Sequence, residues 1–145
     1  MATSAALFNT VAPKDYLGFW ADHTFRAREV ADFLDLDKRD VAKVASVAPA
    51  SVRFDEKMPR VVLERVQEIA NVCDLVAHIF GGDVRKTTLW FKTRNPLLGN
   101  ISPRDMIRFG RYQRLQRFIQ DAIAETLAAD AESGDGEPRA GLGAV

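Results

Sequence analysis

The feature that most constrains this chain is a long stretch, residues 59–80, in which apolar residues recur at spacings of three and four. This spacing is typical of a helix with one buried face. The positions on that face are Val62, Val66, Ile69, Cys73, Val76 and Phe80. Pro59 suits the first helical position, and Gly81 and Gly82 mark the end. The stretch therefore predicts a long helix whose apolar face other elements must cover.

Shorter helical patterns flank this helix, and no segment alternates as a strand would. We expect them over residues 26–34, 38–46, 49–54 and 84–92, from Ser102 onward, and in a last helix with an apolar stripe from Tyr112 to Ile123. A chain of 145 residues with 47% apolar composition can bury one core of ordinary size. The sequence therefore predicts an all-α fold in which two helical units share the long central helix.

Composition sets the expected boundaries and limits the function classes. We divide the chain into an N-terminal arm (1–25), a helix-turn-helix unit (26–80), a second helical unit (81–128) and a glycine-rich, flexible tail (129–145). Twenty acidic and twenty basic residues cancel, so binding to nucleic acid would need a local patch. Without a membrane-spanning apolar run or a leader pattern, we expect a cytoplasmic protein that does not bind membranes.

No residue pattern indicates catalysis. Cys73 and His78 lie five residues apart on one helix, where they point in different directions and cannot chelate a metal together. The sequence offers no defensible nucleophile, base and acid, and no glycine-rich phosphate loop. We therefore expect no metal and no cofactor, and an enzyme of unrecognised type is the weakest of three function classes.

A candidate DNA-binding unit lies in residues 37–54. Small and apolar residues fall at the offsets of a helix-turn-helix: Val41 and Ala42, then Ala45, Ser46 and Val47, then Val52. The residues that would face DNA are Pro49, Ala50, Ser51 and Arg53. Only Arg53 suits bidentate contact with guanine, and Ser46 stands where this turn most often has glycine. A helical hairpin that packs without touching DNA explains the pattern equally well.

The segment KTRNPLLGNISPRDMI, residues 92–107, interrupts two helical patterns with an elbow. Pro96 disfavours helical geometry at Asn95, and Gly99 or Asn100 can adopt a left-handed conformation. Ser102 as N-cap and Pro103 as first residue then start a new helix. Five arginines follow at spacings of three or four: Arg104, Arg108, Arg111, Arg114 and Arg117. If the two helices after the elbow are collinear, these arginines line one side and form a docking surface.

The run LWFKTRNPLLGNISPRDMIRFG resembles the signature of the Xre/MbcA/ParS antitoxin family. The matching positions are Trp90, Asn95, Pro96, Leu98, Gly99, Ser102, Pro103 and the segment 105–107. Family members place an Xre-like helix-turn-helix before a long helix that ends near Phe-Gly, as in HIFGGD here. The resemblance covers about residues 26–125. Asn100 departs from it, because many members have a second glycine there.

The resemblance implies a homodimeric antitoxin within a toxin–antitoxin hetero-oligomer. Its partner would be a RES-family toxin that consumes NAD or uses it for ADP-ribosylation, neutralised by covering the active-site cleft. The implied toxin-binding residues are Asn95, Pro96, Leu98, Gly99, Arg104, Arg108, Arg111 and Arg114. Repression of its own operon through operator DNA is a further expectation. The alternative is a helix-turn-helix repressor without a toxin partner.

The tail adds a hypothesis of its own. Its carboxylates, Asp130, Glu132, Asp135 and Glu137, could mimic the phosphates of NAD in a toxin cleft. An ordinary soluble tail is the simpler interpretation.

Overall fold

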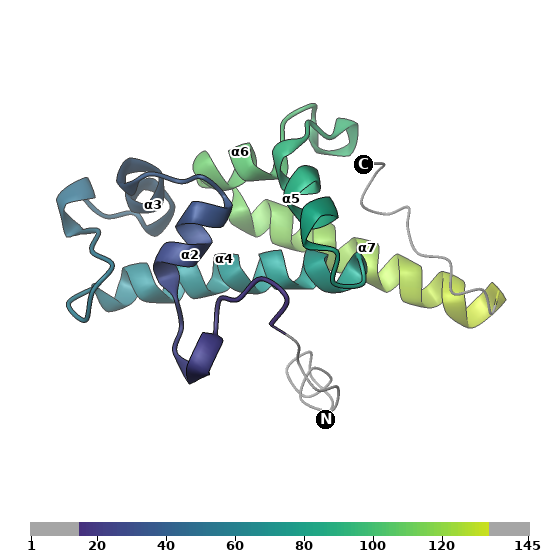
Figure 1. Ribbon diagram of the computed structural model, residues 1–145. Coiled ribbons are helices and arrows are strands. Elements are labelled where there is room, and N and C mark those ends of the chain that lie inside the picture. The colour runs from purple at the N-terminus through teal and green to yellow at the C-terminus, as the bar shows by residue number, and fades with distance from the viewer. Residues whose placement is uncertain (1–14, 134–145) are drawn as a thin grey trace, which may run out of the picture.

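The computed structural model describes residues 15–133 and shows a helical bundle (Figure 1). Its α-helices are α2 (Ala27–Phe33), α3 (Lys38–Ala45), α4 (Arg60–Ile79), α5 (Val84–Lys92), α6 (Pro103–Arg108) and α7 (Tyr112–Ser133). Three single 3-10 turns connect them: η1 (Ala21–His23), η2 (Pro49–Ser51) and η3 (Pro96–Leu98). Residues 15–133 contain no strand, only one isolated bridge between Asn95 and Ile101. The predicted all-α fold is confirmed.

The long predicted helix is α4, and it lies at the centre of the bundle. It contacts α2, α3, α5 and α7, and α7 runs along it (Figure 1). The expected inward positions are buried, apart from the half-buried Phe80 at its end. Burial raises the pKa of the Cys73 thiol well above its ordinary value, so Cys73 acts as a small apolar core residue. No helix within residues 15–133 is long and apolar enough to cross a membrane.

Part of the N-terminal arm packs on the body. The Asp15 carboxylate accepts hydrogen bonds from the backbone N–H groups of Phe19 and Trp20, at 2.9 and 2.8 Å. Phe19 is buried, and its ring meets Phe33 of α2 edge-on. This contact joins residues 15–25 to the core, while residues 1–14 lie outside the described part of the chain.

The third predicted helix is wrong in extent. Instead of a helix over residues 49–54, the chain forms the single turn η2 and then an extended Val52, whose side chain is buried. The Asp55 carboxylate accepts from the N–H of Lys57 at 2.9 Å and pairs with Arg53 at 2.8 Å. These local bonds hold the backbone in a turn and compete with a continued helix.

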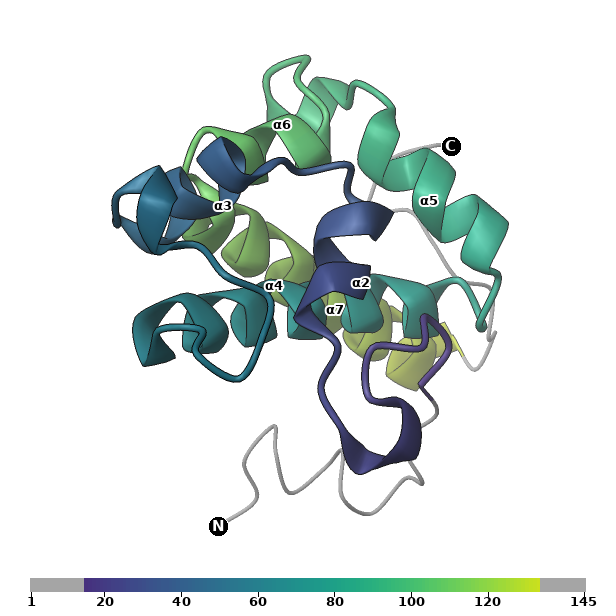
Figure 2. The same ribbon diagram turned by 60° about the vertical axis from the view of Figure 1, so that its left-hand side comes forward.

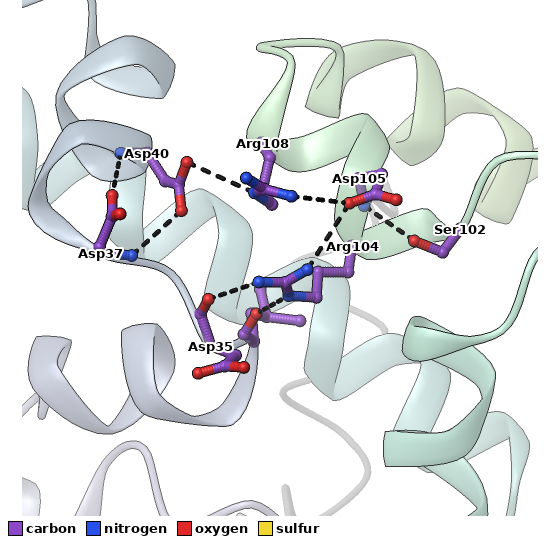
Figure 3. A network of polar contacts seen from close by, with 8 residues as sticks. Asp35, Asp37, Asp40, Ser102, Arg104, Asp105 and Arg108 are labelled. Carbon is purple, nitrogen blue, oxygen red and sulfur yellow. Dashed lines mark hydrogen bonds and ion pairs between the residues drawn. The ribbon is translucent and has the colours of Figure 1, made fainter.

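Arg104 fastens α6 to the end of α2 (Figure 3). Its guanidinium donates to the carbonyl oxygen of Leu34, and to that of Asp35 at 2.6 Å. These carbonyls lie where α2 ends, so no further helical turn supplies them with donors. A side chain about seventy residues away thus completes the hydrogen bonding at the end of α2.

Arg108 makes a second connection, between α6 and the start of α3. It lies 3.4 Å from Asp40 and 3.1 Å from Asp105 (Figure 3). Asp40 also closes a capping box with Asp37, whose carboxyl pKa is lowered mainly by the hydrogen bond from the Asp40 N–H. Figure 2 shows α3 and α6 side by side at one end of the bundle, where these bonds fix their packing.

Replacing Arg104 by alanine should therefore destabilise the protein. The Leu34 and Asp35 carbonyls lose charged donors, and we expect a loss of roughly 1.5–3 kcal/mol in the free energy of unfolding. Urea denaturation followed by circular dichroism measures this loss. The control is Arg114→Ala on α7, where the side chain is exposed, with an expected change within about 0.5 kcal/mol. Equal stability of the two variants would contradict the anchoring role.

Candidate functional site

The elbow is a closed loop tied together at its two ends. The backbone N–H of Asn95 donates to the carbonyl of Ile101 at 3.1 Å, and the N–H of Asn100 donates to the carbonyl of Asn95 at 3.0 Å. The Asn95 side chain accepts from the N–H of Leu97 at 2.9 Å, which caps η3. Each end of the loop is thus hydrogen-bonded to the other, and the loop joins α5 to α6 in a defined shape.

Positive φ angles turn the chain at the positions that the sequence predicted. Gly99 has φ +80° and Asn100 has φ +64°, so both residues are left-handed. No atom outside the neighbouring residues lies within 4 Å of a Cβ placed on Gly99. The requirement for glycine there comes from the backbone angle and not from crowding.

The cap of α6 agrees with the prediction. The Ser102 hydroxyl accepts from the N–H of Asp105 at 3.1 Å, and Pro103 occupies the first helical position. Ser102 and Pro103 are both buried. The helix that follows the elbow therefore begins at a fixed point and carries Arg104 and Arg108 toward α2 and α3.

The elbow presents a mixture of buried and exposed residues. Asn95 is only 5% exposed and Leu98 packs against the core, whereas Pro96 and Gly99 are exposed. Leu97 is 59% exposed, although the sequence analysis did not single it out. Leu97 therefore offers an apolar contact that a partner could bury.

The expected line of five arginines does not form. Gly110, with φ +78°, turns the chain after α6, and α6 packs against α7 instead of continuing into it. Arg104 and Arg108 are used within the fold, as described above. The exposed members are Arg111, Arg114 and Arg117, and none of them forms an ion pair within residues 15–133. Spacing alone did not separate the structural arginines from the exposed ones.

A larger basic region surrounds these residues. Between positions 83 and 117 the only acidic residues are Asp83 and Asp105. The basic residues there are Arg85, Lys86, Lys92, Arg94, Arg104, Arg108, Arg111, Arg114 and Arg117. All except Arg104 and Arg108 are exposed. Arg85, Lys86, Lys92 and Arg94 do not belong to the arginine spacing, and only the separation of charge along the chain indicates them.

The candidate DNA-binding residues lie on η2 and the loop after it. Pro49 and Ala50 are exposed and Ser51 is half-buried. Arg53 is exposed, but its guanidinium is held by Asp55 at 2.8 Å. Because the expected second helix has shrunk to three residues, these side chains do not share one helical face. Ser46 does adopt the left-handed turn conformation, with φ +58°, and Val52 is a buried anchor.

A further hollow on the described surface lies apart from the elbow and borders the loop that holds Arg53. It measures about 720 Å³ and separates the segment around η1 and α2 from the loop that precedes α4. Phe25, Phe54, Met58 and Leu63 form its apolar part, and its charged residues carry both signs. Among residues 15–133, no group of histidine, cysteine or carboxylate side chains is arranged to hold a metal ion.

The tail carboxylates cannot be compared with this geometry. Residues 134–145 lie outside the described part of the chain, and the side chains of residues 130–133 are not described either. The phosphate-mimic hypothesis stays a prediction.

Comparison with known proteins relates the chain to one group of antitoxins. It is 32% identical over 97 residues to the mycobacterial cidal antitoxin MbcA of Mycobacterium tuberculosis (strain H37Rv), and equally to that of Mycobacterium bovis. The match covers 67% of this chain and 77% of each relative. No protein-family model and no solved structure matches the chain. At this identity and coverage, and with the closed Asn-Pro-Leu-Leu-Gly elbow in place, the chain belongs to the MbcA family of antitoxins.

Proposed function

We propose that this antitoxin binds a RES-family toxin and blocks the cleft in which that enzyme degrades NAD or uses it for ADP-ribosylation. The relationship to MbcA is the observation that carries the proposal, because it covers two thirds of the chain. The signature residues of the elbow support it as well. In this proposal the protein is a cytoplasmic homodimer within a toxin–antitoxin hetero-oligomer, with its toxin-binding unit over residues 81–128.

The elbow suits binding because its conformation is set before a partner arrives. Its hydrogen bonds and left-handed residues leave little ordering entropy to lose on association. We assign Pro96 and Gly99 to direct contact, and Asn95 and Leu98 to holding the loop in shape. Arg104 and Arg108 contribute to toxin binding only indirectly. They hold α6 in place, and their side chains are bonded within the fold.

Arg111 and Arg114 supply charge to the proposed contact. Both are exposed at the start of α7. A cleft that holds the two phosphates of NAD brings positive groups of its own, so these arginines should meet carboxylates at its rim. These contacts at the rim would speed the association of the two proteins. Other parts of the antitoxin would then cover the cleft.

A second candidate is repression through operator DNA, either alongside toxin binding or without it. The left-handed Ser46 after α3 and the buried Val52 match the offsets of a helix-turn-helix. If the protein binds DNA, the residues that face it would be Pro49, Ala50, Ser51 and Arg53. Arg53 would then leave its ion pair with Asp55 and bind a guanine or a phosphate.

Replacing Gly99 by valine should weaken toxin binding. A β-branched residue at φ +80° is strained, which distorts the elbow, and we expect about tenfold or greater loss of affinity. The measurement is the Kd for the RES-type protein encoded beside this gene, together with growth rescue on co-expression. The matched control is Gly18→Val, which imposes similar strain at φ +74° in the N-terminal arm. Equal loss of affinity in both variants would argue against the elbow as the docking site.

Replacing Arg53 by alanine should weaken operator binding by about 1–3 kcal/mol and leave toxin neutralisation unchanged. Electrophoretic mobility shifts at several salt concentrations, combined with growth rescue, separate the two activities. Lys57→Ala, an exposed cation in the same loop, is the control. Loss of operator binding and rescue together would contradict a division between the two regions. Unchanged operator binding would remove Arg53 from the DNA contact.

A further inference from the structure

We propose that the exposed face of α5 is a second docking surface, which receives a toxin segment that presents a large apolar side chain between carboxylates. We call it the α5 face and define it by Arg85, Lys86, Leu89 and Lys92. This inference rests on the proposed function and specifies where, and through which chemistry, the toxin is held in addition to the elbow.

The helical spacing gathers these residues on one side. Arg85 and Lys86 precede Leu89 by four and three positions, and Lys92 follows it by three. Residues at such spacings are surface neighbours on a helix. Leu89 is 54% exposed, so an apolar side chain lies in the open at the centre of three cations.

The opposite side of α5 holds this face rigidly. Trp90 and Phe91 are buried in the core, and their rings meet edge-on at 5.0 Å between centroids. Thr87 is also buried, and its hydroxyl donates to the carbonyl of Asp83 at 2.8 Å. A partner would therefore meet a preformed surface and not a mobile segment.

The face is hollowed where an apolar side chain would enter. A shallow, open hollow of about 220 Å³ is lined by Asp83, Arg85, Lys86 and Leu89. The Asp83 carboxylate is already engaged, because it accepts from the N–H of Lys86 at 2.9 Å as the cap of α5. The lining thus combines the apolar Leu89 with two cations, and its carboxylate, Asp83, is already used as the cap of α5.

The cations themselves lack anionic partners. Within residues 15–133, neither Arg85 nor Lys92 forms an ion pair, and the Lys86 amine lies 5.9 Å from the centre of the Phe80 ring. Elsewhere in the described part of the chain, Arg26 and Arg60 each pair with a carboxylate four positions away. Carboxylates from a partner would give these cations the opposite charges that the described part of the chain does not supply.

The exposed leucine favours protein over nucleic acid as the partner of this face. Phosphates are bound by cationic, hydroxyl and amide groups, and Leu89 gains nothing from such contact. Protein interfaces instead bury an apolar anchor within a polar rim, which is the arrangement of the α5 face. Leu97 of the elbow, 59% exposed, follows α5 in the chain and can extend the same interface.

The test compares affinities for the purified RES-type protein encoded beside this gene. We expect Leu89→Asp to raise the Kd about tenfold or more, and Leu89→Ala, which keeps the helix, to raise it several-fold. The paired reversal Arg85→Glu with Lys92→Glu should slow association several-fold and flatten its salt dependence. The matched controls are Val61→Asp, an exposed apolar residue at the start of α4, and Lys57→Glu, both expected within about twofold.

The outcomes distinguish a failure of the α5 face from a failure of the proposed function. If the wild-type chain binds the toxin and the Leu89 variants bind equally well, the α5 face is wrong and the proposed function stands. If the wild-type chain does not bind, both are wrong. If the charge reversals abolish binding to duplex DNA while Leu89→Ala leaves toxin affinity unchanged, the face contacts nucleic acid and the inference is overturned. Thermal denaturation of every variant confirms that it is folded.

Discussion

The hydrogen bonds from Arg104 to the end of α2 determine how the elbow is held. They join α6 to a segment about seventy residues earlier, and Arg108 adds a connection to α3 through Asp40. The elbow connects α5 to this fixed α6, so its shape depends on both helices. A short helix of six residues has little stability of its own, and these charged contacts supply part of what it lacks.

Much of the fold could be predicted because its strongest signals are local. The apolar period of α4, the cap at Asp37 and the Ser102–Pro103 start of α6 each depend on residues close together in the chain. The turn at Gly99 was predictable for the same reason, since few residues accept its backbone angle. The predicted helix over residues 49–54 failed because bonds to the Asp55 carboxylate favour a turn there.

The candidate site was less predictable, because the roles of its arginines are set by tertiary contacts. Arg104 and Arg114 belong to the same sequence spacing, yet one bonds to the carbonyl groups of another helix and the other is exposed. The basic residues of α5 could have been found from charge separation, because only Asp83 and Asp105 are acidic between positions 83 and 117. In the proposed function, these exposed cations bind carboxylates of the toxin.

The most direct test is hydrogen–deuterium exchange of the free antitoxin and of its complex with the proposed RES-type toxin. A rigid docking surface predicts that the bonded amides of Asn95, Leu97 and Asn100 are protected before binding. In the complex, exchange should slow further over residues 84–117 and stay unchanged over 38–58. Fast exchange at the elbow in the free protein, or slowing confined to residues 38–58, would contradict a preformed docking surface there.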